Sequence, residues 1–281
     1  LIPLCAPGAV SLEIYRALCG TSPLYIKPGL DIPLLAWLIK FAARCRPGTM
    51  LRTMADKNVI LHYSIELFER LLELPDLACD FERTGILTIC KDPKNLKGLE
   101  KKNALLAPYG IGYTPLDRDA LLAREPALKP DIAGGWHSEV DWHLRPDMLI
   151  TAWRKQLTRR GLIIEEHAKL LDFEISGNII THVNTVKGRF SADAFILATG
   201  AWAPHTAKQL GLNLPVQPGK GYSITMERPG ICPSMPCVLY EKSMVVTPWK
   251  SGYRLGGTME FSGYSTSLNA RRLSKLVKGA A

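Results

Sequence analysis

One strongly apolar segment constrains the fold of this chain more than any other. It reads AFILATGAW, from Ala194 to Trp202. Its apolar residues do not alternate with polar ones, which predicts a strand that is buried on both faces, as in a parallel sheet. Ligands of open α/β sheets bind at the carboxyl ends of such strands. The segment therefore predicts an α/β chain with a ligand near Thr199 and Gly200, although a plain strand-to-helix turn is also compatible with it.

Helical and strand patterns alternate along the rest of the chain. Apolar residues at helical spacing, bounded by Pro, Gly and small polar residues, predict helices over 11–19, 31–45, 50–74, 94–106, 116–123, 145–161 and 267–278. Alternating apolar residues and glycine-containing turns predict strands over 84–90, 162–166, 170–176, 178–186, 194–198, 220–227, 237–248 and 251–260.

The charge of the chain is strongly basic, with a formal net charge of +9 and a pI of about 9.2. The basic residues gather over 91–102, at 159–160 and over 271–278, which indicates solvated helix faces or attraction to an anionic membrane surface. No aromatic residues are interleaved with them, so we expect no nucleic-acid partner. Seven widely spread cysteines without a C-x-x-C pair indicate reduced thiols and a cytoplasmic protein.

Several segments share their order and pattern with one known family. They are WLIKFAARC (37–45), PLDRDALLAREPAL (115–128), the strand, hairpin and A-T-G-A-W run (162–200), LNLPVQPGKGYSI (212–224) and YRLGGTMEFSGY (253–264). In this order they resemble the FAD-dependent oxidoreductases of the D-amino-acid oxidase superfamily, D-amino-acid dehydrogenase branch. The family's G-x-G-x-x-G loop, which binds pyrophosphate, and its G-x-R-P segment do not occur in this sequence.

The resemblance implies the interior portion of a two-domain FAD-binding fold. Its class is α/β, with an incomplete Rossmann-like part and an α+β substrate domain built on a mixed or antiparallel sheet. The expected division is a helical bridging region over 1–80, a first substrate part over 81–145, the FAD-binding part over 146–215 and a second substrate part over 216–281.

The same resemblance implies which residues form the site. The expected FAD contacts are Leu170, Ala198, Thr199, Gly200 and Trp202. The expected substrate contacts are Tyr222, Ser243 and Val245, and strand alternation places the last two on one face. The flavin carries the redox chemistry, so no catalytic acid or base is assigned to the protein.

The implied activity is oxidative deamination of a D-amino acid to a 2-oxo acid and ammonia, by hydride transfer to the flavin. A dehydrogenase would pass electrons to a quinone or respiratory carrier, which suits a cytoplasmic protein peripheral to the inner face of the membrane. A glycine-oxidase-like enzyme would use oxygen instead. A non-catalytic fragment without a competent FAD site is the remaining alternative, because the glycine-rich loop is absent.

One further segment, WHSEVDWH, alternates His137, Glu139, Asp141 and His143. On an extended strand these four side chains would share a face and form a metal site. We expect a solvated polar face instead, and no metal, because the four residues lie on one strand and no loop wraps an ion; a place for His143 or Asp141 near the substrate is the remaining alternative.

Overall fold

The computed structural model describes residues 31–280, together with Gly8, Val10, 15–16, Ser22 and 24–27. Its main feature is a mixed eight-stranded sheet, counted over these residues. The strands are β1 (Leu24–Ile26), β2 (Ile86–Cys90), β3 (Thr114–Asp117), β4 (Gly134–Ser138), β8 (Lys220–Met226), β9 (Cys237–Leu239), β10 (Met244–Trp249) and β11 (Gly252–Phe261). Their order is β1-β11-β10-β9-β2-β4-β3, and β8 also pairs with β11.

The core lies on one face of this sheet. Leu87, Cys237, Val246, Leu255 and Ile224 follow one another in register across five neighbouring strands. Directly opposed residues lie on the same face, and the first four are at most 4% exposed. Burial of one such aliphatic side chain contributes about 1.5–3 kcal/mol. This apolar row therefore joins strands from distant parts of the sequence into one layer.

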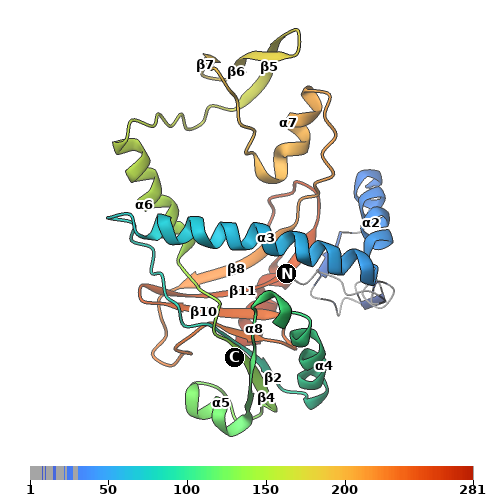
Figure 1. Cartoon of the computed structure of the whole chain (residues 1–281), viewed down its shortest axis with the longest axis vertical. Helices are drawn as coiled ribbons and strands as arrows, with labels where there is room; N and C mark the ends of the chain where they lie inside the picture. The colour runs from blue at the N-terminus through green and yellow to red at the C-terminus, as the bar shows by residue number, and fades with distance from the viewer. Residues whose placement is uncertain are drawn as a thin grey trace.

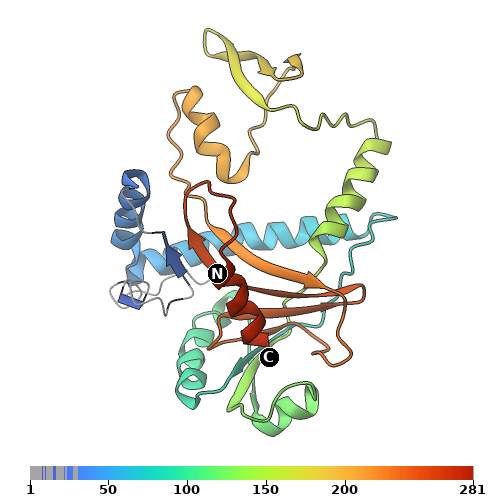
Figure 2. The same cartoon turned by 180° about the vertical axis from the view of Figure 1, so that it is seen from behind.

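The C-terminal helix α8 (Ala270–Ala280) covers the buried face. A Cβ added to Gly257 of β11 would lie 3.2 Å from Cδ2 of Leu276, and one added to Gly279 would lie 3.3 Å from Met244. The helix lies in front of the sheet in Figure 2. In Figure 1, the long helix α3 (Pro47–Leu72) crosses in front of the opposite face.

The predicted helices of the first half are present, with small shifts at their ends. They are α2 (Ile32–Arg44), α3, α4 (Pro93–Ala104), α5 (Arg118–Arg124) and α6 (Pro146–Arg159). Asp31 caps α2 by accepting a 2.9 Å hydrogen bond from the Leu34 amide. The helix predicted over 116–123 starts later, because 114–117 pairs with β4 as a strand. The helix predicted over 11–19 falls largely outside the described residues.

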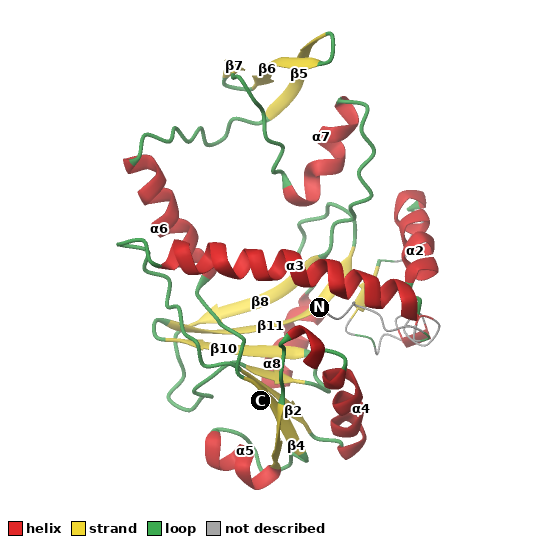
Figure 3. Ribbon diagram, in the orientation of Figure 1, coloured by secondary structure: helices red, strands yellow, loops and turns green. Residues whose placement is uncertain are grey.

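A small antiparallel sheet stands apart from the main one (Figure 3). It contains β5 (Leu170–Ser176), β6 (Ile179–Thr185) and β7 (Gly188–Ser191), in that order. The hairpin turns fall at the two predicted positions, where Gly177 and Gly188 have positive φ angles of 63° and 133°. The short helix α7 (Ala203–Gln209) lies between this sheet and the rest of the molecule (Figure 1).

Two predicted strands are wrong. Residues 162–166 and 194–198 have no strand pairing, and the predicted double burial of AFILA fails. Ile163 is 81% exposed and Ile196 is 93% exposed. A parallel strand forms only beside neighbours that accept and donate its backbone hydrogen bonds, and none of the described strands pairs with either segment. Both segments have the composition of strands, but no described strand forms backbone hydrogen bonds with them.

The described cysteines, which are Cys45, Cys79, Cys90, Cys232 and Cys237, are free thiols. Burial, reinforced by the charge of Glu125, raises the pKa of the Cys237 thiol and so disfavours the nucleophilic thiolate. Cys5 and Cys19 fall outside the described residues. Across the described part of the chain, no helix combines the length and the apolar character that a membrane crossing requires.

Candidate functional site

The turn over 198–202 has the geometry of a ligand-facing backbone. Thr199 precedes a single 3-10 turn, η2 (Gly200–Trp202), and its carbonyl accepts a 3.1 Å hydrogen bond from the Trp202 amide. Gly200 has a φ of +54°, and a Cβ placed there would meet no atom within 4 Å. Trp202 is 57% exposed, and Ala198 is exposed as well. The turn therefore leaves its backbone and one aromatic ring open to a flat ligand.

This turn is attached to the end of β11. The Tyr264 hydroxyl donates a 3.1 Å hydrogen bond to the Ala201 carbonyl. The Tyr264 ring lies nearly perpendicular to the His205 ring, with ring centres 4.3 Å apart, and its centre is 6.3 Å from that of the Trp202 ring. The residues predicted to contact the cofactor are thereby anchored to the main sheet, three residues beyond the last residue of β11, Phe261.

Leu170 lies on the other side of α7. It is the first residue of β5 and is half-buried. The next residue, Leu171, accepts a 3.2 Å hydrogen bond through its carbonyl from Nε2 of Gln209, the last residue of α7. Because α7 follows the 198–202 turn directly, this bond ties the start of the hairpin to the helix that leaves the turn.

The described residues fit one part of an FAD molecule. Gly200 lets a ring approach the backbone closely, and Trp202 offers an exposed aromatic face. The sequence supplies no G-x-G-x-x-G loop for the pyrophosphate. The turn, together with Leu170, would therefore hold the cofactor on one side only.

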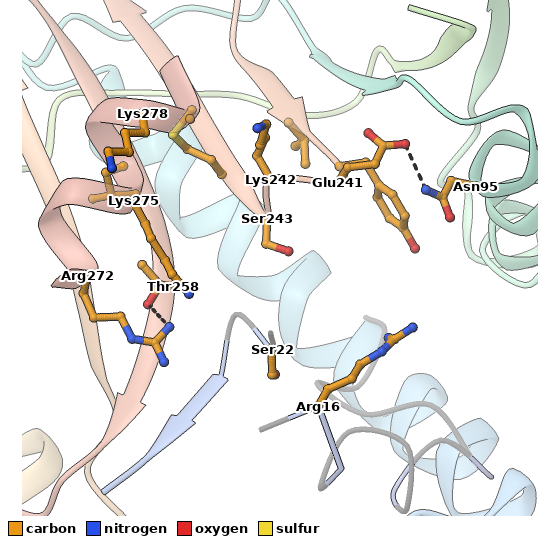
Figure 4. Close-up of a pocket in the computed structure, with 15 residues that line it drawn as sticks. Arg16, Ser22, Asn95, Glu241, Lys242, Ser243, Thr258, Arg272, Lys275 and Lys278 are labelled. Atoms are coloured by element: carbon orange, nitrogen blue, oxygen red, sulfur yellow. Dashed lines mark hydrogen bonds between the residues drawn. The ribbon is translucent and has the colours of Figure 1, made fainter. Parts of the chain in front are cut away.

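A pocket of about 1000 Å³ opens at one end of β10 and beside α8. Figure 4 shows its lining side chains converging from α8, from the turn between β9 and β10, and from Ser22 and Arg16. The lining includes Lys242, Ser243, Thr258, Arg272, Lys275 and Lys278. The guanidinium of the buried Arg272 donates a 2.9 Å hydrogen bond to the Thr258 hydroxyl and lies 5.1 Å from the centre of the Tyr25 ring.

The pocket contains two residues with a strained backbone. Ser243 has a φ of +50° and Thr258 a φ of +56°, a region that residues other than glycine rarely occupy. Thr258 also lies where the β8–β11 register shifts, between Gly257 and Met259. Strained residues and bulges gather at functional sites, where they aim side chains at a ligand. Both hydroxyls belong to the lining of the same cavity.

The other two predicted substrate contacts lie elsewhere. Val245 pairs with Gly256 on the face of the sheet opposite to α8. Tyr222 is 4% exposed, and its hydroxyl donates a 2.8 Å hydrogen bond to Glu260. Neither residue is among those that line the pocket. Of the three predicted substrate contacts, the structure brings only Ser243 to the cavity.

Tyr222 belongs to a buried polar cluster with Lys220 and Glu260. The Lys220 ammonium lies 3.1 Å from a Glu260 oxygen, and it also donates hydrogen bonds to the Ser265 and Ser267 carbonyls. Burial alone would raise the pKa of Glu260, but hydrogen bonds from Ser262, Tyr222 and Lys220 and the lysine charge hold this pKa below its usual range. The cluster joins the K-G-Y segment of β8 to the end of β11.

The segment 136–143 is not one continuous strand, so its histidines and carboxylates do not share the single strand face on which a metal site would have been built. β4 ends at Ser138, and His137 pairs with Leu87 inside the sheet. His143 forms an isolated bridge with Glu82, and burial lowers its pKa. Over the described part of the chain, no group of three or more His, Cys, Asp or Glu side chains is arranged to hold a metal.

Sequence reasoning missed the cationic part of the pocket. Arg272, Lys275 and Lys278 were assigned to a solvated helix face, yet all three line the cavity. Their spacing of three residues places them along one side of α8. That spacing is a signal in the sequence, but the sequence does not show that the side faces a cavity.

Comparisons with known proteins show what the chain is similar to. The family model described as "FAD dependent oxidoreductase" (DAO) matches residues 40–281. A D-amino acid dehydrogenase of Allorhizobium ampelinum is 27% identical over 275 residues, which cover 96% of this chain and 65% of the relative. One of Rhizorhabdus wittichii is 30% identical over 284 residues, covering 98% and 67%. The chain thus spans about two thirds of the length of these relatives.

Solved structures show the same fold. The crystal structure of glycine oxidase from Geobacillus kaustophilus superimposes with a TM-score of 0.68 at 19% identity, covering 90% of this chain and 63% of that one. L-proline dehydrogenase from P. horikoshii gives 0.66 at 19% identity, covering 78% and 60%. Because the family model matches most of the chain, from residue 40 to residue 281, the protein belongs to the DAO family of FAD-dependent oxidoreductases.

Proposed function

We propose that this protein takes part in the FAD-dependent oxidative deamination of D-amino acids to 2-oxo acids and ammonia. The observation that carries the proposal is the strained pair Ser243 and Thr258, whose side chains line one cavity. Thr258 lies on β11, and the same strand leads to Tyr264, which holds the 198–202 turn. The pocket that we propose for the substrate and the turn that we propose for the cofactor are therefore both attached to β11.

In this proposal the residues named above bind either the cofactor or the substrate. When bound, FAD supplies the hydride acceptor. Gly200 and Trp202, with Ala198 and Thr199, contact the cofactor, and Leu170 lies along it. Ser243 and Thr258 orient the substrate through their hydroxyl groups. A role of Tyr222 or Val245 in substrate binding stays a prediction, since the Tyr222 hydroxyl is bonded to Glu260.

The electron acceptor that we propose is a quinone or another respiratory carrier, because the named relatives are dehydrogenases. The basic side chains of the chain, with a net charge of +9, would support peripheral contact of a cytoplasmic protein with an anionic membrane surface. Molecular oxygen is the competing acceptor, and it would yield hydrogen peroxide.

Flavin titration tests the proposal. The protein is mixed with FAD, and binding is followed by the quenching of tryptophan fluorescence and by the flavin absorbance near about 450 nm. D-Alanine is then added without oxygen. We expect saturable FAD binding, weakened in Trp202→Ala and unchanged in Trp153→Ala, followed by bleaching of the flavin band and formation of pyruvate. A protein that takes up no FAD would be the non-catalytic alternative, and the proposal would be wrong.

A further inference from the structure

A polar row crosses the main sheet on the face opposite to α8. Thr225 of β8, Arg254 of β11 and Thr247 of β10 lie directly opposite one another in register, so they share a face. Gly257, which faces Leu276 of α8, lies three residues from Arg254 and therefore points to the other face. Thr225 is exposed, and Arg254 and Thr247 are half-buried. One basic side chain thus lies between two hydroxyl groups where solvent reaches the sheet.

The guanidinium of Arg254 is held on two sides. Its Nε donates a 2.9 Å hydrogen bond to the Thr225 hydroxyl, and its central carbon lies 4.8 Å from the centre of the Trp249 ring, which is 2% exposed. Within the described part of the chain, neither of its Nη atoms forms a hydrogen bond or an ion pair. A guanidinium in a fixed orientation binds a carboxylate through two parallel N–H groups. The Nη edge of Arg254 is free to bind an anion in this way.

The carboxylates of the same region have other partners. The hydrogen bond from Arg145 is the main cause that lowers the pKa of Asp147, and the charge of Arg254 adds to it. Nε of Arg145 lies 3.1 Å from both Asp147 oxygens, and its Nη2 lies 3.0 Å from one of them. Asp80 accepts hydrogen bonds from the amide and the hydroxyl of Ser251. Among the described residues, no carboxylate therefore forms an ion pair with Arg254, and its positive charge attracts an anionic ligand.

A second row beside Arg254 provides space for an apolar group. Ser223, Gly256 and Val245 are opposed across the same three strands, and Gly256 shares the face of Arg254 because it lies two residues along β11. A Cβ added to Gly256 would approach no atom more closely than the Val245 carbonyl oxygen, at 3.9 Å. The missing side chain leaves room above the sheet for a short aliphatic group, which the Val245 side chain can contact.

We propose that this face of the sheet binds a short aliphatic monocarboxylate, with its carboxylate on the Nη edge of Arg254. The Thr247 hydroxyl donates to the same carboxylate, and the aliphatic part lies over Gly256 against Val245. One guanidinium balances one negative charge, so a monocarboxylate suits the site better than a phosphate dianion. The site is distinct from the pocket beside α8, which lies on the other face. It does not rest on the proposed function, since neither FAD nor the 198–202 turn takes part in it.

NMR titration of the protein without FAD tests the site, with 3-methylbutanoate and its amide as probes. The two probes have nearly the same shape and differ in one charge. We expect the carboxylate to bind about tenfold more tightly than the amide, with a preference that falls as salt is added. Its binding should also shift the Nε–H resonance of Arg254, which Thr225 holds in place. Arg254→Gln should abolish the preference. Arg118→Gln, which changes an exposed arginine of α5 that is paired with Asp119, should leave it unchanged.

Two further variants test the site while leaving Arg254 intact. Gly256→Val fills the space over the sheet, so 3-methylbutanoate should lose its advantage over acetate while acetate still binds. Thr247→Val removes one hydroxyl donor and should weaken the binding of both carboxylates several-fold. Thr247→Val also keeps the proposal testable if Arg254→Gln fails to fold.

Equal affinity for 3-methylbutanoate and its amide would overturn the inference, as would an Arg254→Gln protein that folds and keeps the preference. Tighter binding of inorganic phosphate than of 3-methylbutanoate would overturn it as well, because the site would then attract anions in general. Uptake and reduction of FAD are measured separately and bear only on the proposed function.

Discussion

Replacing Glu260 by Gln tests the buried cluster that joins β8 to β11. The Glu260 side chain is 6% exposed, and its oxygens meet the Lys220 ammonium at 3.1 Å and the Tyr222 hydroxyl at 2.8 Å. Breaking a buried ion pair typically costs about 3–5 kcal/mol, because the partner charge is left without compensation. Lys220 keeps the Ser265 and Ser267 carbonyls as acceptors. We therefore expect Glu260→Gln to lower the free energy of unfolding by about 2–3 kcal/mol at pH 7.

The effect should depend on pH with a definite sign. The pKa of Glu260 is held below its ordinary value of 4.5 in the folded protein. Its contribution to stability is thus fully present above the unfolded pKa and is lost as the pH falls through the lower, folded pKa. The difference between wild type and Glu260→Gln should accordingly be largest at neutral pH and should shrink once the pH falls below 4.5.

Urea unfolding at several pH values, followed by tryptophan fluorescence, measures this difference. Glu227→Gln is the matched control, since Glu227 follows β8 directly and is exposed; its effect should stay within about 0.5 kcal/mol. Tyr222→Phe removes only the neutral donor to Glu260 and should cost about 1 kcal/mol. The reasoning would be refuted by a Glu260→Gln effect no larger than that of the control, or by an effect that is equally large at acidic pH.

Three further changes have expected outcomes that unfolding experiments can check. Glu125→Ala should cost about 2–4 kcal/mol, because the buried Glu125 carboxylate accepts hydrogen bonds from both the amide and the hydroxyl of Ser234; a cost below about 1 kcal/mol would contradict this. Gly135→Ala should sharply lower the thermal midpoint, since its Cβ would lie 2.5 Å from the Thr88 carbonyl oxygen; Gly112→Ala, at a site open to solvent, should not. Burial lowers the pKa of His143, so wild-type stability should fall as the pH drops below its ordinary value of 6.5, and His143→Gln should flatten that dependence; an unchanged pH profile would count against it.

Local signals in the sequence predict most helices and hairpins correctly. The helices α2 and α6 follow from their periodic apolar residues and end signals, and the turn at Gly177 follows from its need for a positive φ. AFILA was predicted as a strand, and the structure leaves it unpaired with Ile196 exposed. The composition of a segment sets its preference for a strand, but only a neighbouring strand can satisfy its backbone.

The candidate site was predictable in part, for the same reason. Ser243 is predicted as a substrate contact because its segment precedes Pro248 in a family pattern; the structure places it in the lining of the cavity, and its role in substrate binding stays a prediction. Arg272 and Lys242 were not found, because nothing in the sequence brings α8 beside the β9–β10 turn. Tyr222 is predicted to contact the substrate, but its hydroxyl donates a hydrogen bond to Glu260 of β11, the strand that pairs with β8. Contacts between distant segments decided each of these outcomes.

The unpaired segments 162–166 and 194–198 have a practical consequence for handling the protein. Isoleucine side chains are exposed in both segments, and none of the described strands pairs with either of them. Such backbones can pair with the same segment of a second molecule, which is a route to aggregation. Aggregation should therefore increase with protein concentration more steeply than the net charge of +9 suggests. Light scattering at increasing concentration tests this. If the two segments mediate aggregation, Ile163→Lys and Ile196→Lys should each reduce the scattering.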